Sequence, residues 1–286
     1  MPGTTKAGEA LAMMNEKNLS SVPVAGPDGK VMAFVDLLDV TSLMLNLMRE
    51  AFRIPTKDPN ALQMRLNKMS GKAGEFWNTP VQTIVNLSSR NQWKPVRPGF
   101  SIFDVCNILA TSVHRVPLLT WEGELVSIVS QSKIVSLLND DPKNRLGRMG
   151  KMTAAELGGK KAVLGVKDTT MVMEAFEMLA KNRVGAIPVT DVDGKLCCDI
   201  SSDTAKLVSS EFFKLVKPIK ELREISGGDD SMPIYTCKLD ETLEVMVARV
   251  AKHKARRLWV VDDESKPIGV ISLTDLISAI IGRNDK

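Results

Sequence analysis

The chain has 286 residues, of which 44% are apolar and 25% charged, as expected for a soluble globular protein with room for two ordinary domains. Its formal charge of +4 is too small to favour nucleic-acid binding, and no apolar run approaches the ~20 residues of a membrane span. The chain has only two histidines, and its four cysteines show no CxxC spacing, which argues against a zinc site. Its first residues do not resemble a signal peptide. We therefore expect a cytoplasmic protein with reduced thiols, and the nucleus is the alternative location.

The first part of the chain contains a helix pattern over residues 7–17, with no strand expected in front of it. The apolar triplet Val22-Pro23-Val24 follows, and sixteen residues after its centre stands Asp39. We assign this unit to residues 1–47. Residues 48–80 are expected to form a linker, because they contain helix-breaking residues. These are Pro55, Pro59, Gly71, Gly74 and Pro80.

The next part, residues 81–140, repeats the pattern with a preceding strand. Its triplet is Val116-Pro117-Leu118, and the residue sixteen positions after the centre is Lys133. The expected elements are a strand over 93–96, a helix over 101–110 and strands over 115–119 and 125–129.

Two further units complete the chain, at residues 154–210 and 218–283. Their triplets are Ile187-Pro188-Val189 and Leu258-Trp259-Val260, and the residues at the same offset are Thr204 and Asp275. The expected elements are strands over 163–166, 186–189, 196–200, 234–237, 257–261 and 267–271, with helices over 169–180, from 240 and from 272.

Four units in the same register mean that the fold is built by repetition, each unit having the order β-α-β-β-α. A unit of about 55 residues cannot bury both of its helical faces alone, so the units must pair. We expect an α/β fold in which copy one pairs with copy two and copy three with copy four, as two modules in a flattened disc.

The chain resembles proteins with four tandem cystathionine-β-synthase-type (CBS) domains, and in particular the gamma, nucleotide-sensing subunit of AMP-activated protein kinase. The resemblance rests on residues 237–244, 257–262 and 269–276 of copy four and on Val113-His114-Arg115-Val116-Pro117-Leu118 of copy two. Residues 79–87 (TPVQTIVNL) are also similar to other four-CBS eukaryotic proteins, including fungal phosphatase regulators.

A nucleoside monophosphate needs an apolar slot for the base, an acceptor for the ribose hydroxyls and a cationic site for the phosphate. Asp275 begins a helix, where a carboxylate is favoured, and could accept two ribose hydroxyls with Ser272 and Thr274 beside it. The alternative is that Asp275 is only a helix cap, since Asp, Ser and Thr are the preferred capping residues.

Basic residues stand directly before the triplet strands of copies two and four, as His114-Arg115 and Arg256-Arg257. The resemblance implies that residues at this place reach the phosphate, and the planar fork of arginine suits such a contact. The alternative is an ordinary surface ion pair. Arg183 of copy three lies farther upstream and is a weaker candidate.

Two copies depart from the carboxylate pattern. A buried ammonium at Lys133 cannot accept ribose hydroxyls, so the site of copy two should be empty or hold only an anion. Thr204 removes the carboxylate of copy three, although Asp203 is adjacent. We therefore expect at most two nucleotide sites, built around Asp39 and Asp275.

The sequence predicts a non-catalytic protein without a cofactor, because it has no P-loop, no paired metal ligands and no Ser/His/Asp constellation. By resemblance it is a regulatory subunit that senses AMP, ADP or ATP. Its expected partners are adenine nucleotides and the catalytic and beta subunits of a kinase or another regulated enzyme, with no nucleic acid or membrane. The alternative is a CBS scaffold that regulates a phosphatase or other enzyme through protein interaction, with degenerate nucleotide sites.

Overall fold

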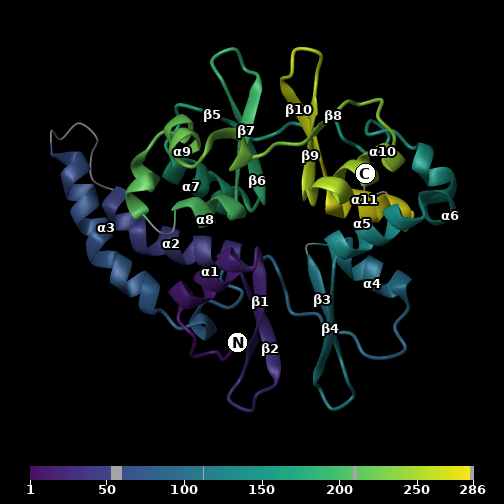
Figure 1. Cartoon of the computed structure of the whole chain (residues 1–286), viewed down its shortest axis with the longest axis horizontal. Helices are drawn as coiled ribbons and strands as arrows, with labels where there is room; N and C mark the ends of the chain where they lie inside the picture. Colours follow the sequence, from purple (N-terminus) through teal and green to yellow (C-terminus); the bar gives the residue numbers. More distant parts are fainter. Residues whose placement is uncertain (53–59, 112, 209–210, 284–286) are drawn as a thin grey trace. The chain divides into compact units, whose positions relative to one another are not determined.

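The computed structural model describes residues 1–52, 60–111, 113–208 and 211–283 (Figure 1). Every repeat contains a first helix, an antiparallel hairpin and a second helix that begins where the hairpin ends. In copy one these elements are α1 (Ala7–Glu16), β1 (Ser21–Ala25), β2 (Val31–Asp36) and α2 (Leu37–Phe52). In copy two they are α4 (Ile102–Leu109), β3 (Arg115–Leu119), β4 (Leu125–Ser130) and α5 (Gln131–Asp140).

Copies three and four add a short first strand to the same order. Copy three consists of β5 (Val166–Lys167), α7 (Val172–Asn182), β6 (Ala186–Thr190), β7 (Leu196–Ser201), η3 (Ser202–Thr204) and α8 (Ala205–Val208). Copy four consists of β8 (Thr236–Cys237), α10 (Leu243–His253), β9 (Arg257–Val261), β10 (Pro267–Ser272) and α11 (Leu273–Ile280). The predicted β-α-β-β-α unit is therefore confirmed in copies three and four.

The first strand is reduced in copies one and two. In copy four, β8 runs parallel to β9 in a three-stranded sheet. In copy two the strand expected over 93–96 is a single bridge between Val96 and Leu118, and in copy one Pro2 makes the equivalent parallel bridge to Ala25. The expectation of no strand in front of the first helix of copy one therefore overlooked this single bridge.

Serine caps fix the starts of three helices. The side chains of Ser101, Ser130 and Ser272 each accept a hydrogen bond from the backbone N–H three residues later, at the starts of α4, α5 and α11. Such a cap satisfies one of the donors that a helix start leaves unpaired. The second helix consequently begins at the same register position in copies two and four.

The repeats share their helical cores in a different pairing from the one we expected. The chain divides into two compact units, Met1–Arg90 with Val166–Ile187 and Asp199–Met232, and Asn91–Gly165 with Pro188–Cys198 and Pro233–Lys286. In the first unit α2 of copy one contacts α7 and η3 of copy three, and in the second α5 contacts α10 and α11. The helical cores thus join copy one with three and copy two with four, so the expected pairing of one with two and three with four is wrong for the helices.

One buried core shows how copies two and four complete each other. Side chains of α4 and α5 interdigitate with those of α10 and α11, and most of them are fully buried. Its members include Leu109, Val135, Met246, Val247, Leu276 and Ile277. Neither copy could remove these faces from water alone, which is the reason that pairing is obligatory.

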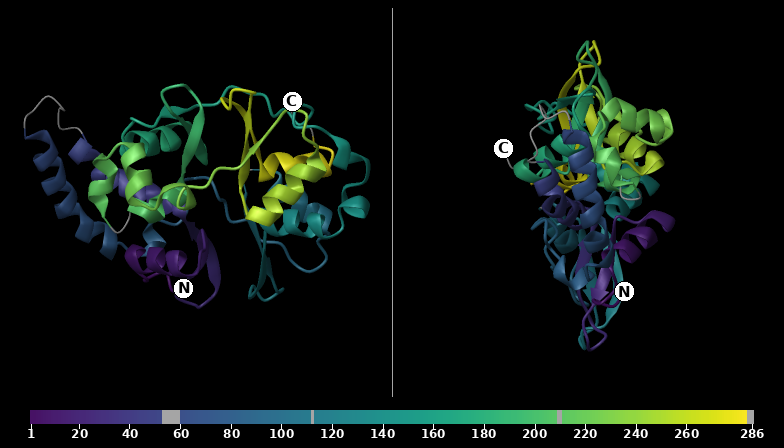
Figure 2. Two further views of the ribbon diagram at one scale, coloured as in Figure 1. Left: turned by 45° about the horizontal axis from the view of Figure 1, so that its top comes forward. Right: turned by 90° about the vertical axis from the view of Figure 1, so that its left-hand side faces the viewer.

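The segment expected to be a linker contains helices. Within residues 48–80, α2 continues to Phe52 and α3 (Ala61–Asn78) spans eighteen residues, side by side with α2 in both figures (Figure 1, Figure 2). The expectation of a linker there was wrong for this part, because the buried side chains of Met69 and Phe76 stabilise α3 in spite of its glycines. Pro55 and Pro59 lie outside the described residues. The remaining short helices are η1 (Val81–Thr83), α6 (Pro142–Leu146), η2 (Gly147–Lys151), η4 (Phe212–Val216), α9 (Ile219–Ile225) and η5 (Gly228–Asp230).

Candidate functional site

In copies two and four, the register of the hairpin places the predicted basic residues opposite the start of the second helix. In copy four, Arg257 lies directly opposite Ser272 in the β9–β10 ladder. The carbonyl of Arg256 accepts a hydrogen bond from the N–H of Leu273 at 3.2 Å. The same pair of contacts recurs in copy two, where Arg115 is opposite Ser130 and Gln131 N–H donates to the His114 carbonyl at 3.1 Å.

Asp275 is a capping residue that retains one outward carboxylate oxygen. Its Oδ2 accepts from the backbone N–H of Ser272 at 2.6 Å and from the Ser272 hydroxyl, and Asp275 N–H donates back to the Ser272 Oγ at 3.3 Å. Its Oδ1 lies 3.4 Å from the ammonium of Lys161. Oδ2 thus acts as a helix cap, as the capping alternative predicts, whereas Oδ1 forms an ion pair with Lys161 at the surface.

Lys161 was not anticipated from the sequence. It belongs to the segment that leads into copy three, yet this segment lies along the edge of β10 of copy four. Lys160 bridges Gly269, and Lys161 N–H donates to the Ile268 carbonyl at 3.2 Å. Since Lys161 and Asp275 are separated by 114 positions, no local motif could have indicated that they meet.

The side-chain hydroxyl of Thr274 connects the starts of two helices. Its Oγ accepts a hydrogen bond at 2.8 Å from Nε2 of Gln131, which also donates to the Leu109 carbonyl at 2.8 Å. Gln131 is buried, so this amide holds the first turn of α5 against the first turn of α11. The basic residues of copies two and four therefore flank adjacent helix starts within one compact unit.

The environment of Lys133 is not the buried one that we expected. Its backbone N–H donates to the Ser130 cap at 3.2 Å, but its side chain is exposed. The predicted buried ammonium is therefore wrong, although the residue still offers no carboxylate to a ribose.

Asp39, by contrast, is closed off from solvent. Its side chain is 1% exposed, and its two oxygens accept from the backbone N–H groups of Asp36 at 3.0 Å and Ser88 at 2.9 Å. Burial, followed by the charge of Asp36, raises the pKa of Asp39 to about 7, while these hydrogen bonds act in the opposite direction. Both oxygens of Asp39 are thus used in hydrogen bonds to the backbone.

Copy three has neither of the two predicted features at its helix start. The Thr204 Oγ accepts from Ser201 N–H at 3.1 Å as part of a cap, and Asp203 lies 3.9 Å from Lys206. Arg183 ends α7 in the left-handed conformation, at φ 52°, and is exposed. At the place of the basic pairs stands Gly185, where a Cβ would lie 3.7 Å from the guanidinium of Arg90. Arg90 is a cation that the motif did not reveal.

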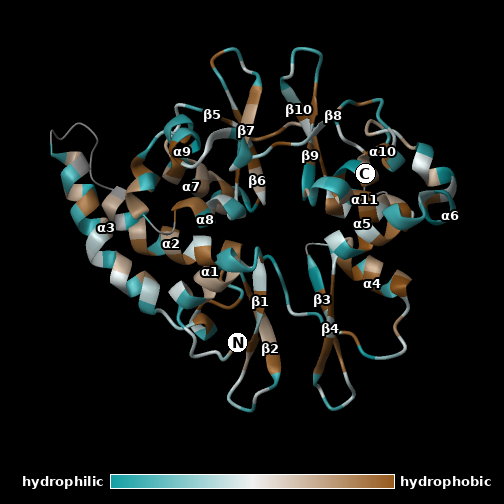
Figure 3. Ribbon diagram, in the orientation of Figure 1, coloured by the Kyte–Doolittle hydropathy of each residue, from teal (hydrophilic) through white to brown (hydrophobic). Residues whose placement is uncertain are grey.

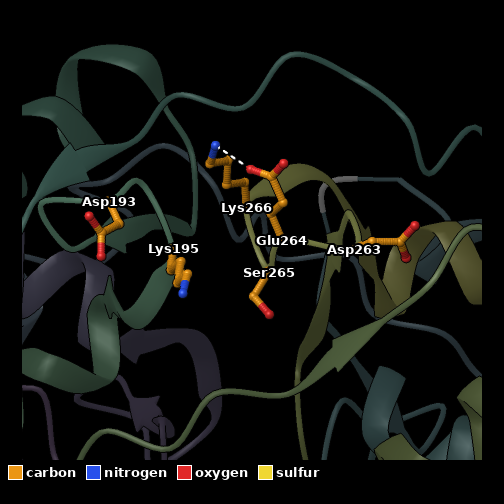
Figure 4. Close-up of a pocket in the computed structure, with 6 residues that line it drawn as sticks. All are labelled: Asp193, Lys195, Asp263, Glu264, Ser265 and Lys266. Carbon is orange, nitrogen blue, oxygen red and sulfur yellow. Dashed lines mark hydrogen bonds and ion pairs between the residues drawn. The ribbon is translucent and has the colours of Figure 1, made fainter.

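An open polar hollow lies away from all of these residues, between the hairpin turns of copies three and four (Figure 4). Asp193 and Lys195 come from one turn, and Asp263 to Lys266 from the other. Lys266 is paired with Glu264 at 2.6 Å, and Leu196 N–H donates to the Ser265 carbonyl at 3.0 Å. The hollow contains none of the predicted site residues and lacks the apolar walls that a base requires.

Within the described parts of the chain, no group of His, Cys, Asp or Glu side chains is placed to hold a metal ion. Over the same residues, the helices are too short or too polar to cross a membrane.

The CBS domain family profile matches residues 1–46, 157–203 and 223–282, which together make up just over half of the chain. These ranges fall on copies one, three and four. The profile spans most of each of these copies, and so it supports the repeat independently of the triplets.

Relatives of two kinds resemble the chain along most of its length. It is 24% identical to Protein SDS23 of Kluyveromyces lactis over 97% of this chain and 59% of that protein. It is 22% identical to the 5'-AMP-activated protein kinase subunit gamma of Saccharomyces cerevisiae, over 96% and 83% respectively. It is 25% identical to the SNF1-related protein kinase regulatory subunit gamma-1-like of Arabidopsis thaliana, over 72% and 50%. The chain thus spans about three fifths of the first of these relatives and half of the last.

Solved structures show the same fold. Protein MJ1225 of Methanocaldococcus jannaschii, described as a proposed archaeal homologue of the AMPK gamma subunit, matches with a TM-score of 0.71 at 20% identity, over 97% of this chain and 94% of that one. A conserved protein of Pyrococcus horikoshii matches with a TM-score of 0.55 at 17% identity, over 91% of both chains. At these identities the likeness concerns the fold alone.

Proposed function

Because the chain belongs to the CBS domain family, we propose that it is a non-catalytic regulatory protein that binds an adenine nucleotide, as a kinase gamma subunit does. The supporting observation is the start of α11, where the outward oxygen of Asp275 lies 3.4 Å from the Lys161 ammonium and the backbones of Arg256 and Arg257 pair with the residues that open the helix. Two of the relatives are named as gamma subunits of kinases. The proposed protein partners are the other subunits of a kinase, or another regulated enzyme.

The arrangement suits a ribose phosphate. Oδ1 of Asp275 would accept a ribose hydroxyl, since Oδ2 is already used by the cap. Lys161, now 3.4 Å from Oδ1, would turn to the phosphate, together with Arg256 or Arg257. The positive end of the α11 dipole adds to the attraction for an anion.

We expect one accessible ribose site, in copy four. The carboxylate of Asp39 is buried and bonded to Ser88, so copy one would have to open this loop before it could bind. Copy two has Lys133, and copy three has Thr204, at the position of the carboxylate. A stoichiometry of one is therefore the natural outcome for this chain.

The test uses two capping carboxylates in the same structural setting. Asp275→Ala and Asp104→Ala each remove the acidic partner of a serine capping box, in α11 and α4. Because the same cap is lost in both, the two changes should lower the stability of the fold by similar, small amounts. We expect Asp275→Ala alone to weaken nucleotide binding, by tenfold or more, as measured by isothermal titration with AMP, ADP, ATP and S-adenosylmethionine.

The two variants also separate the explanations. If both bind nucleotide as the unchanged protein does, Asp275 is a cap and nothing more, and the proposed ribose contact is wrong. If both lose binding equally, the loss comes from stability and not from the lost acceptor.

The second candidate function is a scaffold that regulates a phosphatase or another enzyme through protein contacts. It is favoured by the closed state of Asp39 and by the missing carboxylates of copies two and three, which are features of sites that no longer bind. A folded protein that binds none of the four ligands in the titration would support it over nucleotide sensing.

A further inference from the structure

Copies one, three and four each hold an equivalent segment against the start of their first helix. The segments are residues 79–88, 217–226 and 152–161, respectively. In each, the carbonyl of the segment's first residue accepts a hydrogen bond from the first N–H of the helix, at 2.7, 3.0 and 2.7 Å. The N–H of its third residue donates to the carbonyl two residues before the helix, at 2.8, 2.9 and 2.9 Å. These shared bonds align the three segments residue by residue, without a gap.

The last residue of the segment meets the start of the second helix in copies one and four. In copy one, Ser88 N–H donates to Oδ1 of Asp39 at 2.9 Å. In copy four, the ammonium of Lys161 lies 3.4 Å from Oδ1 of Asp275. The last residue of the copy-three segment is Ser226. One position of the fold thus contacts the same carboxylate oxygen in two repeats, and of the three segments that of copy four alone places a cation there.

The backbone of Lys161 is held in place, whereas its ammonium can move. Lys161 N–H donates to the Ile268 carbonyl at 3.2 Å, and a Cβ at Gly269 would overlap the carbonyl of Gly159, so the segment lies directly on β10. The Lys161 side chain is 43% exposed and has a flexible four-carbon stem. The ammonium can therefore exchange one anionic partner for another without any movement of the segment.

The strand beneath the segment does not account for the charge. β10 has the sequence PIGVIS, without a charged residue, and the hydrophilic residues of this hairpin gather in the turn before it (Figure 3). The acidic neighbour of Lys161 is Asp275, whose Oδ2 is already used by the helix cap. The cation therefore lies against the one oxygen that a ribose hydroxyl would need.

On the basis of the nucleotide site proposed above, we propose that Lys161 determines which class of ligand this site accepts: nucleoside phosphates in preference to uncharged nucleosides. A ribose hydroxyl competes with the ammonium for Oδ1 of Asp275. A nucleoside offers the displaced ammonium no negative charge, whereas a nucleoside phosphate gives it a new anionic partner. Because an exposed ion pair contributes little by itself, the preference comes mainly from this new contact with the phosphate.

The test compares AMP with adenosine, which has the same base and ribose but no phosphate. Both are titrated calorimetrically into the full chain. We expect AMP to bind the wild type at least tenfold more tightly than adenosine. In Lys161→Met, which keeps the apolar stem, the ratio of the two affinities should fall at least fivefold. AMP binding should weaken, and adenosine binding should stay the same or improve. Lys161→Arg keeps a cation and should retain the preference.

The matched control is Lys160→Met, which removes the same charge one residue earlier from a side chain that is also exposed. It should leave the ratio unchanged, and neither methionine variant should unfold, since both side chains lie at the surface. An unchanged ratio in Lys161→Met, or an equal fall in both variants, overturns the inference. A wild type that binds the two ligands equally well also overturns it, while the proposed nucleotide binding stands. A wild type that binds neither ligand overturns both.

Discussion

Gly269→Ala should destabilise the second unit by about 3 kcal/mol, the upper part of the range for overpacking. A Cβ at Gly269 would overlap the backbone carbonyl of Gly159, which cannot turn aside as a flexible side chain could. The clash would separate the 159–161 segment from β10 and break the hydrogen bond from Lys161 N–H to Ile268. Urea unfolding followed by tryptophan fluorescence measures the loss.

The same substitution should also weaken nucleotide binding, since it displaces Lys161 from the neighbourhood of Asp275. Gly74→Ala is the control for the chemistry of the change. Gly74 lies inside α3 with open space where a Cβ would be, so alanine should stabilise the helix by up to ~1 kcal/mol. Gly269→Ala with wild-type stability would show that the edge of β10 is not closely covered.

The sequence predicted the repeats well because their signals are local. Apolar triplets, turns and capping residues recur at fixed offsets, and helices such as α10 and α11 begin within a few residues of the expected places. The pairing of the helical cores was not predictable in this way. Every copy has an apolar helical face, and the choice among partners depends on contacts such as Gln131 with Thr274, which are 143 positions apart.

The candidate site could be predicted in part for the same reason. The hairpin register fixes Arg257 beside Ser272, and this register can be read from one copy alone. Lys161, Ser88 and Arg90 come from segments between the repeats, so their positions depend on how those segments fold back. The sequence did not predict the environment of Asp39 either. The equivalent residue of copy four, Asp275, has a partly exposed side chain, whereas Asp39 is buried.

The buried Asp39 should make the stability of the first unit depend on pH. Its pKa is about 7 in the folded protein, against an ordinary value of 3.8. Below pH 4 the carboxyl is protonated in both states. Between pH 4 and 7 only the unfolded chain releases the proton, so the free energy of unfolding falls as pH rises, by about 1.4 kcal/mol per pH unit at most. Above pH 7 this loss is constant.

Asp39→Asn should remove this dependence. Asparagine has one carbonyl acceptor for the two N–H groups of Asp36 and Ser88, so we expect the variant to be no more stable than the wild type at pH 4. It should become the more stable of the two as pH approaches 7, because it cannot ionise. Urea unfolding of both proteins at pH 4, 5, 6 and 7 gives the difference directly.

Asp104→Asn provides a control of opposite sign. Hydrogen bonds from Ser101 hold the pKa of Asp104 below its usual value, so its contribution is present above pH 4 and is lost as pH falls through the lowered pKa. This variant should therefore lose stability relative to the wild type near neutral pH, where Asp39→Asn gains it.

If the stability difference between Asp39→Asn and the wild type stays constant from pH 4 to 7, the Asp39 carboxyl is not buried beneath Ser88. In that case copy one offers a second open carboxylate to a nucleotide, and the stoichiometry of one that we expect would have to rise.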